Sequence, residues 1–452
     1  MESQVKTVQE INEKIDDGSV RVVTAAEMTQ IVSELGPDEA AHEVDVVTTG
    51  TFGAMCSSGM WMNLGHSEPP IKMSRVWLND VEAYGGIAAV DAYLGATQLS
   101  ETQGMEYGGG HVIEDLIRRK SIHLRAEAYG TDCYPRKELS TEICVDDMNQ
   151  AILSNPRNCY ERYAVAVNPS NKTLYTYMGK LQPNLGNATF SGAGEIAPII
   201  NDPSYRTIGI GSRIFLGGTD GYVIGNGTQH NPGAGYGTLS VQGNLKEMSS
   251  DFIRGATMTK YGCTLFVGVG VPIPVLNSDI AKSTSVSDED IVTSVLDYSV
   301  PSRSRPSLRD VTYAELKTGS IEVNGHEIPT APISSFRVAE CIANLLKKQI
   351  STGEFQLTKP VKTLSSTVAC NSMNQREYQT NSLKQTRVTV PDSQLVYRDQ
   401  ARCINCALCV SYCPSKVFTR DENWNVSDNP DLCVGCGECS DICPQRAIAV
   451  RS

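Results

Sequence analysis

The sequence has few aromatic residues, fewer basic than acidic residues and no long uninterrupted apolar segment. Only 6% of its 452 residues are aromatic, and 39 Lys and Arg stand against 51 Asp and Glu, a formal net charge of −12. An acidic chain of this kind lacks the extended basic surface that releases counterions from a nucleic acid. We therefore expect no nucleic-acid partner.

Membrane and secretion signals are also missing. The longest apolar run, from Cys263 to Leu276, contains Pro272 and Pro274 and is shorter than the ~20 residues that a membrane span requires. Residues 1–17 are polar and contain acidic groups, so they lack the apolar core of a signal peptide. We expect a cytoplasmic protein without membrane contact, and we interpret the apolar run as a buried strand.

Nucleotide-binding motifs are absent from the glycine-rich segments. Gly108-Gly109-Gly110 precedes a predicted helix and would offer free amides to an anion at its N-terminus. It lacks the lysine of a phosphate-binding loop, and the segment from Gly209 to Gly237 lacks the spacing of a dinucleotide fingerprint. We expect no nucleotide cofactor.

The first 355 residues alternate helical and strand patterns, which predicts an α/β or α+β catalytic domain with a mixed sheet. The expected elements are helices near 5–15 and 25–35, after residue 110 and over 334–350, strands over 44–48 and 121–129, and a hairpin of 162–167 with 174–178. Residues 352–393 are polar and typical of a linker. The predicted domains are residues 1–355, a linker over 356–394 and a small domain over 395–452.

Fifteen cysteines without a secretory signal indicate metal binding or thiol chemistry in a reducing compartment. Eight of them form two runs of Cys-x-x-Cys-x-x-Cys-x-x-x-Cys-Pro after residue 400. In bacterial ferredoxins three cysteines of such a run bind one 4Fe-4S cluster and the fourth binds the other. The predicted ligand sets are Cys403, Cys406, Cys409 and Cys443 for one cluster, and Cys433, Cys436, Cys439 and Cys413 for the other.

A pair of zinc sites is the alternative interpretation of these eight cysteines. Zinc knuckles bind one ion with four ligands arranged as two pairs. That pattern does not account for two complete runs of four cysteines, each followed by a proline. We therefore predict a small α+β domain of the bacterial ferredoxin type. Its two clusters would be one-electron carriers that together deliver two electrons.

Two of the scattered cysteines lie in segments suited to chemistry. Cys56 follows a predicted strand within a run of small residues, where backbone amides are open to a ligand, although a plain glycine turn explains this run equally well. Cys133 is followed by Arg136 and Lys137, which would favour the nucleophilic thiolate. The remaining scattered cysteines lie in apolar, helical or linker contexts and are expected to be inert: Cys144, Cys159, Cys263, Cys341 and Cys370.

The predicted strand before Cys133 carries titratable side chains on one face. Strand alternation places His123, Arg125 and Glu127 on one side and apolar residues on the other. A solvated edge face is the plain alternative, because such alternation is common in antiparallel sheets. The segment is nevertheless a candidate wall of an active site.

Three segments, Val44–Gly59, Gly65–Met73 and Tyr129–Pro135, resemble the homocysteine biosynthesis family of anaerobic archaea and bacteria, the L-aspartate semialdehyde sulfurtransferases. The resemblance covers residues 1–355. In some relatives a two-cluster ferredoxin is a separate subunit, whereas here it is fused to the same chain. The resemblance implies that Cys56 and Cys133 handle sulfur.

The reaction implied by the resemblance joins L-aspartate semialdehyde with sulfide, or with sulfur held as a cysteine persulfide, to give L-homocysteine. Aldehyde and sulfide require two electrons to give a thiol, and a persulfide raises the number to four. Our hypothesis is that Cys133 carries sulfur and that Cys56 is its partner in relay or resolution. An external low-potential electron donor is expected as a further partner.

Neighbouring residues supply candidates for the remaining roles. Arg125 and Arg136 would bind the substrate carboxylate, because a guanidinium pairs with it bidentately. Glu127 or Asp132 would hold the ammonium group, and His123 would protonate the departing oxygen.

Two other interpretations stay open. Cys56, Cys133 and a third thiol could ligate a third iron–sulfur cluster, which would raise the iron content from about eight to about twelve per chain. The chain could also be an electron carrier or cluster scaffold without a substrate of its own. The oligomeric state, including a homo-oligomer, is left open.

Overall fold

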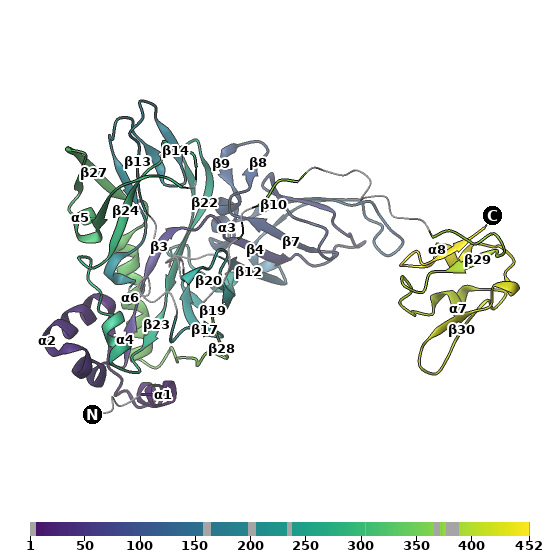
Figure 1. The fold of residues 1–452 in the computed structure, drawn as a ribbon, viewed down its shortest axis with the longest axis horizontal. Helices are drawn as coiled ribbons and strands as arrows, with labels where there is room; N and C mark the ends of the chain where they lie inside the picture. Colours follow the sequence, from purple (N-terminus) through teal and green to yellow (C-terminus); the bar gives the residue numbers. More distant parts are fainter. Residues whose placement is uncertain are drawn as a thin grey trace. The chain divides into compact units, whose positions relative to one another are not determined.

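The computed structural model describes residues 6–156, 164–197, 205–232, 237–302, 304–365, 371, 373–376 and 388–451. The chain divides into two compact units, residues 1–371 and 372–452, and each is described by itself (Figure 1). Cys159 and Cys370 lie outside the described residues.

Three large sheets form the larger unit, which has the predicted mixed α and β character. The nine-stranded sheet contains, in spatial order, β21 (Ile253–Met258), β22 (Gly262–Gly270), β18 (Arg213–Leu216), β19 (Thr219–Asn226), β20 (Leu239–Asn244), β12 (Gln150–Asn155), β4 (Gly59–Asn63) and β7 (Asp91–Gly95), with β3 (Thr51–Ala54) paired to β22. The predicted buried strand is therefore β22, whose neighbours are β3, β18 and β21.

The other two large sheets each have six strands. One is antiparallel and contains β11 (Glu138–Ile143), β10 (Ile122–Glu127), β5 (Arg75–Leu78), β6 (Val81–Ala83), β8 (Leu99–Ser100) and β9 (Gly104–Gly108). The other contains β25 (Ser307–Thr312), β24 (Val292–Asp297), β13 (Val165–Val167), β16 (Ala188–Phe190), β27 (His326–Pro332) and β26 (Ser320–Val323). This sheet is mixed, because β13 pairs with β24 and β16 pairs with β27 in parallel.

Within the described residues, small sheets and six helices complete the larger unit. The small sheets are β1 (Val22–Thr24), β2 (Val46–Thr48) and β23 (Pro272–Pro274); β14 (Leu174–Thr176) with β15 (Gly179–Leu181); and β17 (Gly209–Ile210) with β28 (Lys362–Thr363). The helices are α1 (Val8–Asp17), α2 (Ala25–Glu43), α3 (Gly109–Ile117), α4 (Ser278–Ser283), α5 (Tyr313–Lys317) and α6 (Phe336–Ser351). Among the described helices, none combines the length and apolar character that crossing a bilayer requires.

Helix starts follow local sequence signals. Thr7 accepts the Glu10 backbone N–H, and the Glu10 carboxylate accepts the Thr7 backbone N–H. Thr24 and Glu27 form the same capping box at the start of α2. Such caps satisfy backbone donors that have no partner within the helix. The predicted first, second and last helices of this unit are accordingly present.

Helix α6 lies directly against the strand that leads to Cys56. A Cβ atom on Gly50 would lie 2.0 Å from the carbonyl oxygen of Ala339 in α6, so only glycine permits this approach. The Thr48 hydroxyl donates to the carbonyl of Ala343 at 2.9 Å, and the Ser335 N–H donates to the carbonyl of Phe52 at 2.9 Å. These contacts fix the backbone just before the candidate thiol.

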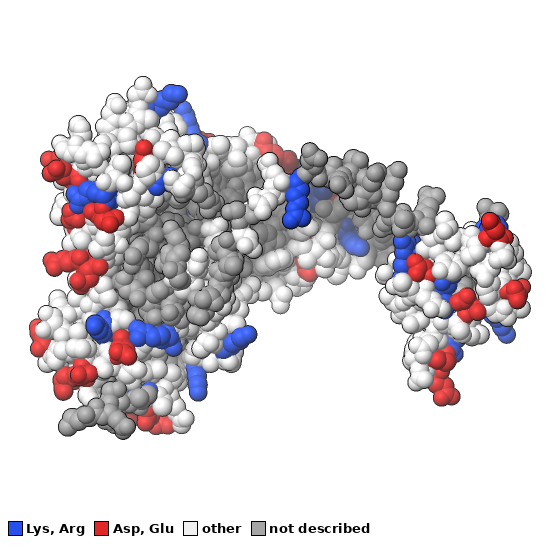
Figure 2. All heavy atoms as spheres, in the orientation of Figure 1, with Lys and Arg blue, Asp and Glu red and all other residues white. Residues whose placement is uncertain are grey.

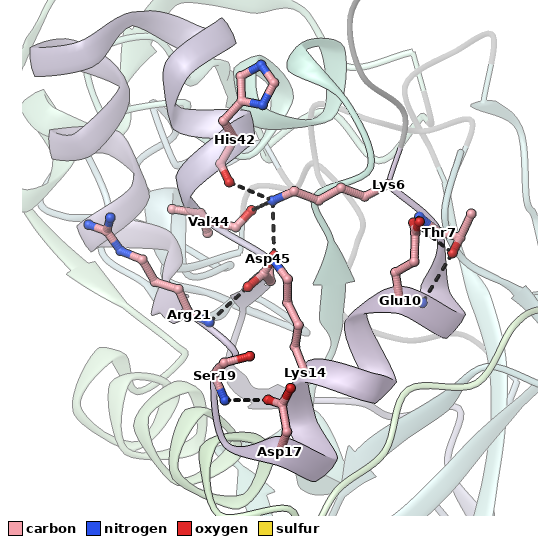
Figure 3. Close-up of polar contacts among 10 residues, drawn as sticks. All are labelled: Lys6, Thr7, Glu10, Lys14, Asp17, Ser19, Arg21, His42, Val44 and Asp45. Carbon is pink, nitrogen blue, oxygen red and sulfur yellow. Dashed lines mark hydrogen bonds and ion pairs between the residues drawn. The ribbon is translucent and has the colours of Figure 1, made fainter.

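A buried carboxylate ties the N-terminal segment to β2 (Figure 3). The Asp45 side chain accepts from the ammonium groups of Lys6 at 3.0 Å and Lys14 at 2.7 Å, and from the backbone N–H of Arg21 at 3.0 Å. Lys6 also donates to the carbonyls of His42 and Val44. Because Asp45 is only 1% exposed, its charge is stabilised by these partners rather than by water.

Two predictions about the middle of the chain are wrong. The segments 162–167 and 174–178 do not pair as a hairpin, since β13 lies between β24 and β16 while β14 pairs with β15; residues 162–163 lie outside the described residues. Regular alternation of helix and strand also fails, because strands follow α3 (Gly109–Ile117) until α4 begins at Ser278, with only short 3-10 turns between them in the described segments. Long-range strand pairing leaves no local pattern that a sequence window can detect.

The segment that was predicted as a linker begins with ordered structure. Phe355 and Leu357 are buried in the larger unit, and β28 pairs with β17.

On the visible face of the larger unit, Lys and Arg side chains are interspersed with Asp and Glu (Figure 2). Hence no large surface of one sign covers the described residues on that face.

In the smaller unit two short helices and two antiparallel strand pairs enclose the cysteine runs. The helices are α7 (Leu408–Tyr412) and α8 (Glu438–Asp441), and the strand pairs are β29 (Val396–Arg398) with β32 (Ile448–Val450) and β30 (Phe418–Arg420) with β31 (Val426–Asp428). This is the small α+β domain that the sequence predicted.

Candidate functional site

Cys56 lies on an exposed turn between β3 and β4. The pairing of β3 with β22 places Ala54 opposite Phe266, and the Met55 N–H donates to the Leu265 carbonyl at 2.7 Å. The turn is therefore held to β22 of the nine-stranded sheet, with the thiol at the surface. A rigid strand end that presents a thiol to solvent suits a nucleophile.

A tyrosine from another part of the chain lies near this thiol. Tyr261 follows β21, and burial together with the nearby Cys56 and Tyr177 raises the pKa of its hydroxyl. The rings of Tyr177 and Tyr261 are 6.4 Å apart, and the Tyr177 hydroxyl lies 2.9 Å from that of Tyr298. Tyr261 is therefore the phenol near Cys56, and Tyr177 and Tyr298 extend the same aromatic group away from it.

Cys133 lies on the exposed loop between β10 and β11. Thr131 and Tyr134 exchange backbone hydrogen bonds at 2.9 and 3.1 Å across this loop. The ring of Tyr134 stacks on His66 at 5.9 Å, and the Arg136 N–H donates to the Pro70 carbonyl at 3.3 Å. Two of the segments that carry the family resemblance, Gly65–Met73 and Tyr129–Pro135, are therefore packed together around Cys133.

Cys56 and Cys133 occur at opposite ends of β4. Cys56 precedes this strand, while His66, which contacts the Cys133 loop, follows it. Five strand residues span roughly 13 Å at about 3.3 Å per residue. Among the described residues no contact joins the two thiols, and we infer that a direct relay between them requires movement of the loop or a second copy of the chain.

The titratable side chains on β10 share one face, as the alternation predicts, with Ile122, Leu124 and Ala126 buried on the other. His123 Nε2 lies 2.8 Å from the Ser140 hydroxyl. Arg125 stacks on Trp77, with its guanidinium carbon 3.6 Å from the ring centroid.

Most charges around this face already have partners. Arg125 pairs with Glu101 at 3.4 Å and with Glu127 at 3.5 Å. Arg136 donates to the carbonyls of Glu68 at 2.6 Å and Pro69 at 2.9 Å. Asp132 is exposed. A substrate carboxylate at Arg125 or Arg136 would therefore have to compete with groups that are already bound.

Gly108-Gly109-Gly110 does not offer free amides at the start of α3. The three N–H groups donate to His111 Nδ1, the Gln98 carbonyl and the Ala96 carbonyl. A Cβ on Gly109 would lie 1.9 Å from the Gly95 carbonyl oxygen. The glycines are needed for close packing of α3 on the sheet rather than for anion binding.

The cysteine array in the smaller unit surrounds a cavity. Four cysteines, together with apolar residues such as Ile404 and Val426, line a solvent-open space of about 340 Å³. These four are Cys403, Cys406, Cys409 and Cys443. Within the described residues no three His, Cys, Asp or Glu side chains converge as they would on a single ion.

The other four cysteines form a second group of related geometry. Burial, with the neighbouring Cys413, Cys433 and Cys436, raises the pKa of Cys439 to about 11. Burial, with Cys403 and Cys406 nearby, likewise raises the pKa of Cys409 to about 11. Neutral thiols relieve this mutual repulsion when no metal is present, and iron removes it by binding the thiolates.

Backbone hydrogen bonds to sulfur repeat in both halves of the tail. The Val417 N–H donates to Cys413 Sγ at 3.4 Å, and the Ala447 N–H donates to Cys443 Sγ at 3.3 Å. Such bonds stabilise thiolate charge and tune cluster potentials. The internal repeat that the sequence predicts for the tail is therefore present, and both halves fit a 4Fe-4S cluster.

A buried cation stands beside one cysteine of the cavity. Arg398 is 8% exposed, its Nε donates to Asp428 at 2.8 Å, and its guanidinium also contacts the Cys403 thiol. The Cys403 sulfur therefore lies next to a fixed positive charge.

The remaining cysteines differ in their surroundings. Cys263 is buried on β22, and burial raises the pKa of its thiol, which agrees with the inert role expected for it. Cys144 is half-buried, and its N–H donates to Asp147. Cys341 was expected to be inert within an apolar context, but it lies on the solvent-exposed face of α6.

Residues 20–357 match the family model described as homocysteine biosynthesis enzyme, sulfur-incorporation. The chain belongs to this homocysteine biosynthesis family. Residues 395–445 match a 4Fe-4S dicluster domain, which implies two clusters in the tail and agrees with the cysteine geometry.

Two relatives in the homocysteine biosynthesis family share more than half of the aligned residues. An L-aspartate semialdehyde sulfurtransferase of Methanosarcina acetivorans is 59% identical over 372 residues, which are 82% of this chain and 74% of the relative. One of Methanocaldococcus jannaschii is 54% identical over 375 residues, covering 80% and 73%. The tail is similar to pyruvate synthase subunit PorD of Thermotoga maritima, at 32% over 76 residues, covering 17% and 69%.

Sequence reasoning missed the tyrosines beside Cys56. They come from the turn after β21 and from the turn between β14 and β15, far from Cys56 along the chain. No local motif marks them, since their only shared property is their position in the folded domain.

Proposed function

We propose that this member of the homocysteine biosynthesis family converts L-aspartate semialdehyde and sulfide, or cysteine-bound persulfide sulfur, to L-homocysteine. The observation that carries the proposal is the pairing of this family's domain with a dicluster ferredoxin domain on one chain. The two relatives from Methanosarcina acetivorans and Methanocaldococcus jannaschii are both L-aspartate semialdehyde sulfurtransferases, which supports the same reaction. This chemistry requires free thiols and reduced iron–sulfur clusters, and we infer a cytoplasmic location because the cytoplasm is a reducing compartment.

Electron counting explains the fused tail. The aldehyde, hydrogen sulfide, two electrons and two protons give the thiol and water. Each 4Fe-4S cluster, when bound, exchanges one electron, so two clusters match the requirement. An external low-potential donor of electrons is part of the proposal, and a persulfide donor would require a second pair.

Cys133 is the proposed carrier of sulfur, as thiolate or persulfide, and Cys56 is its proposed partner. Both thiols are exposed, as nucleophiles that meet diffusing reactants must be. Because β4 separates them, the relay needs displacement of the Cys133 loop or the loop of a second copy in a homo-oligomer.

The β10 face and the loop that follows it contribute the remaining proposed roles. His123 would protonate the departing oxygen, and its hydrogen bond with Ser140 orients the ring. Arg125 and Arg136 are candidates for the carboxylate if their present acceptors are displaced, and Glu127 or Asp132 are candidates for the ammonium group.

The full-length chain, purified and assayed without oxygen, is expected to form homocysteine from L-aspartate semialdehyde, sulfide and a low-potential reductant. Thiol derivatisation followed by mass spectrometry measures the product. A chain whose clusters are reduced but which neither binds nor converts the semialdehyde would be an electron carrier or scaffold instead. Reactions without reductant are the control, since the electron count predicts no product in them.

Iron content distinguishes the tail clusters from a third cluster on Cys56 and Cys133. We expect about eight irons per chain, because two cubanes hold four each. A content of about twelve that falls to about eight in the Cys56→Ser variant would instead place a further cluster in the larger unit. The matched variant is Cys341→Ser, which removes another exposed thiol.

A further inference from the structure

Aromatic side chains around Cys56 are accompanied by cations that lack anionic partners. Lys260 immediately precedes Tyr261, and its ammonium nitrogen lies 5.0 Å from the ring centroid of Tyr175. The ring of Tyr177, in the turn after β14 (Leu174–Thr176), lies 6.4 Å from that of Tyr261. The turn that carries Lys260 and Tyr261 therefore contacts both Tyr175 and Tyr177, and Tyr261 itself lies near Cys56.

These cations differ from those on β10. In the described part of the chain neither Lys260 nor Arg305 has an ion pair, and Arg305 Nε is buried without a hydrogen-bond acceptor. Arg305 stacks on Tyr298, with its guanidinium carbon 3.9 Å from the ring centroid. Arg125 and Arg136, in contrast, are bound by carboxylates or carbonyls. Of these cations, Lys260 is adjacent in sequence to Tyr261, the residue that lies near Cys56.

Two buried hydroxyls without partners lie close to the Cys56 turn. Ser58 is 1% exposed and Thr264 is 3% exposed, and neither side-chain oxygen has a hydrogen-bond partner. Ser58 is two residues after Cys56, and Thr264 is the next residue of β22 beyond Leu265, whose carbonyl accepts the Met55 N–H. Unpaired buried hydroxyls cost free energy unless a ligand or water satisfies them.

We propose that this Cys56 site binds the anionic aldehyde substrate, with Lys260 on its carboxylate and the Tyr261 hydroxyl on its carbonyl oxygen. The identity of the aldehyde rests on the proposed function. A cation beside aromatic rings and a thiol suits a short molecule with a carboxylate at one end and an electrophilic carbon at the other. This assigns the carboxylate to Lys260 rather than to Arg125 or Arg136.

The chemical step at this site involves no oxidation or reduction. The Cys56 thiolate forms an S–C bond with the aldehyde carbon while the C=O π bond breaks. The oxygen takes the proton of the Tyr261 hydroxyl, which gives a thiohemiacetal, and the phenolate recovers a proton from solvent. A tyrosine hydroxyl is protonated at neutral pH and can donate this proton.

Charge-selective alkylation of the intact, anaerobic holoprotein tests the site without turnover. Peptide mass spectrometry gives the rates at Cys56 with iodoacetate, an anion, and with neutral iodoacetamide, and the exposed Cys341 is the internal reference. We expect the ratio of the iodoacetate rate to the iodoacetamide rate to be higher at Cys56 than at Cys341. We expect Lys260→Gln to lower the Cys56 ratio by about two- to five-fold, the size of one exposed charge interaction.

Lys282→Gln is the matched control, because Lys282 is an exposed lysine on α4 and its loss should leave the Cys56 ratio unchanged. Saturating L-aspartate semialdehyde should also slow alkylation of Cys56 in the wild-type chain but less in Lys260→Gln. A Cys56 ratio equal to that of Cys341, or one that Lys260→Gln does not change, overturns the anion site. Charge selectivity without protection by the semialdehyde keeps the anion site and overturns the assigned aldehyde, so the two failures are distinguishable.

Discussion

Replacement of Cys133 by serine is expected to lower the rate of homocysteine formation by about 10³-fold or more, because a hydroxyl cannot carry persulfide sulfur and is a far weaker nucleophile at neutral pH. The side chain keeps its size, and the exposed loop has no buried contact at this position that the change would disturb. The measurement is the initial rate under anaerobic conditions with sulfide, reductant and saturating semialdehyde.

Cys341→Ser supplies the comparison for this result, since it removes an exposed thiol from α6 and should retain full activity. Iron content and the reduced-cluster spectrum should be the same in the wild type and both variants, which separates loss of sulfur handling from loss of electron supply. Normal turnover by Cys133→Ser would show that sulfur does not pass through this residue.

The tail illustrates what a sequence can predict well. Its ligands lie within short runs whose spacing is dictated by the geometry of a cubane, and the structure gathers Cys443 with Cys403, Cys406 and Cys409 around one cavity. Local chemistry and tertiary structure coincide there, because three of the four cysteines around this cavity come from one short run.

Strand β10 and helix α6 were predictable for a related reason. Alternation over Ile122–Glu127 and helical periodicity over Phe336–Ser351 are local consequences of burying one face. The bounds differ from the predicted ones by only one or two residues, which is the usual uncertainty of element ends.

The Cys56 site was not predictable in the same way. Tyr261 and Lys260 come from the turn after β21, Tyr177 comes from the turn after β14, and Arg305 precedes β25. Their convergence depends on the pairing of β3 with β22 and on the packing of separate sheets. Arg136, which the sequence suggests for the substrate carboxylate, donates to the backbone carbonyls of Glu68 and Pro69 in the folded chain, and this contact leaves no local pattern either.

Asp45→Asn is expected to lower the free energy of unfolding of the larger unit by about 3–5 kcal/mol at neutral pH, because it removes one partner of a buried ion pair. The Asp45 side chain is 2% exposed and that of Lys6 is 15% exposed, so the ammonium of Lys6 would remain largely buried without a counter-charge. Urea titration followed by tryptophan fluorescence measures the change. Glu43→Gln is the control, because Glu43 pairs with Arg21 at the surface and should cost less than about 1 kcal/mol.

The effect of Asp45→Asn should also depend on pH in a defined direction. Burial opposes ionisation of Asp45, but the Arg21 N–H and the ammonium groups of Lys14 and Lys6 outweigh it and hold the pKa below its ordinary value. The unfolded chain therefore takes up this proton first as the pH falls, so the stabilisation is complete above the unfolded pKa of about 3.9 and is lost below it. The difference between wild type and variant should be constant from pH 7 to 5 and should shrink as the pH falls through 4. A difference that grows below pH 4 would contradict a charged Asp45 as the source of the stabilisation.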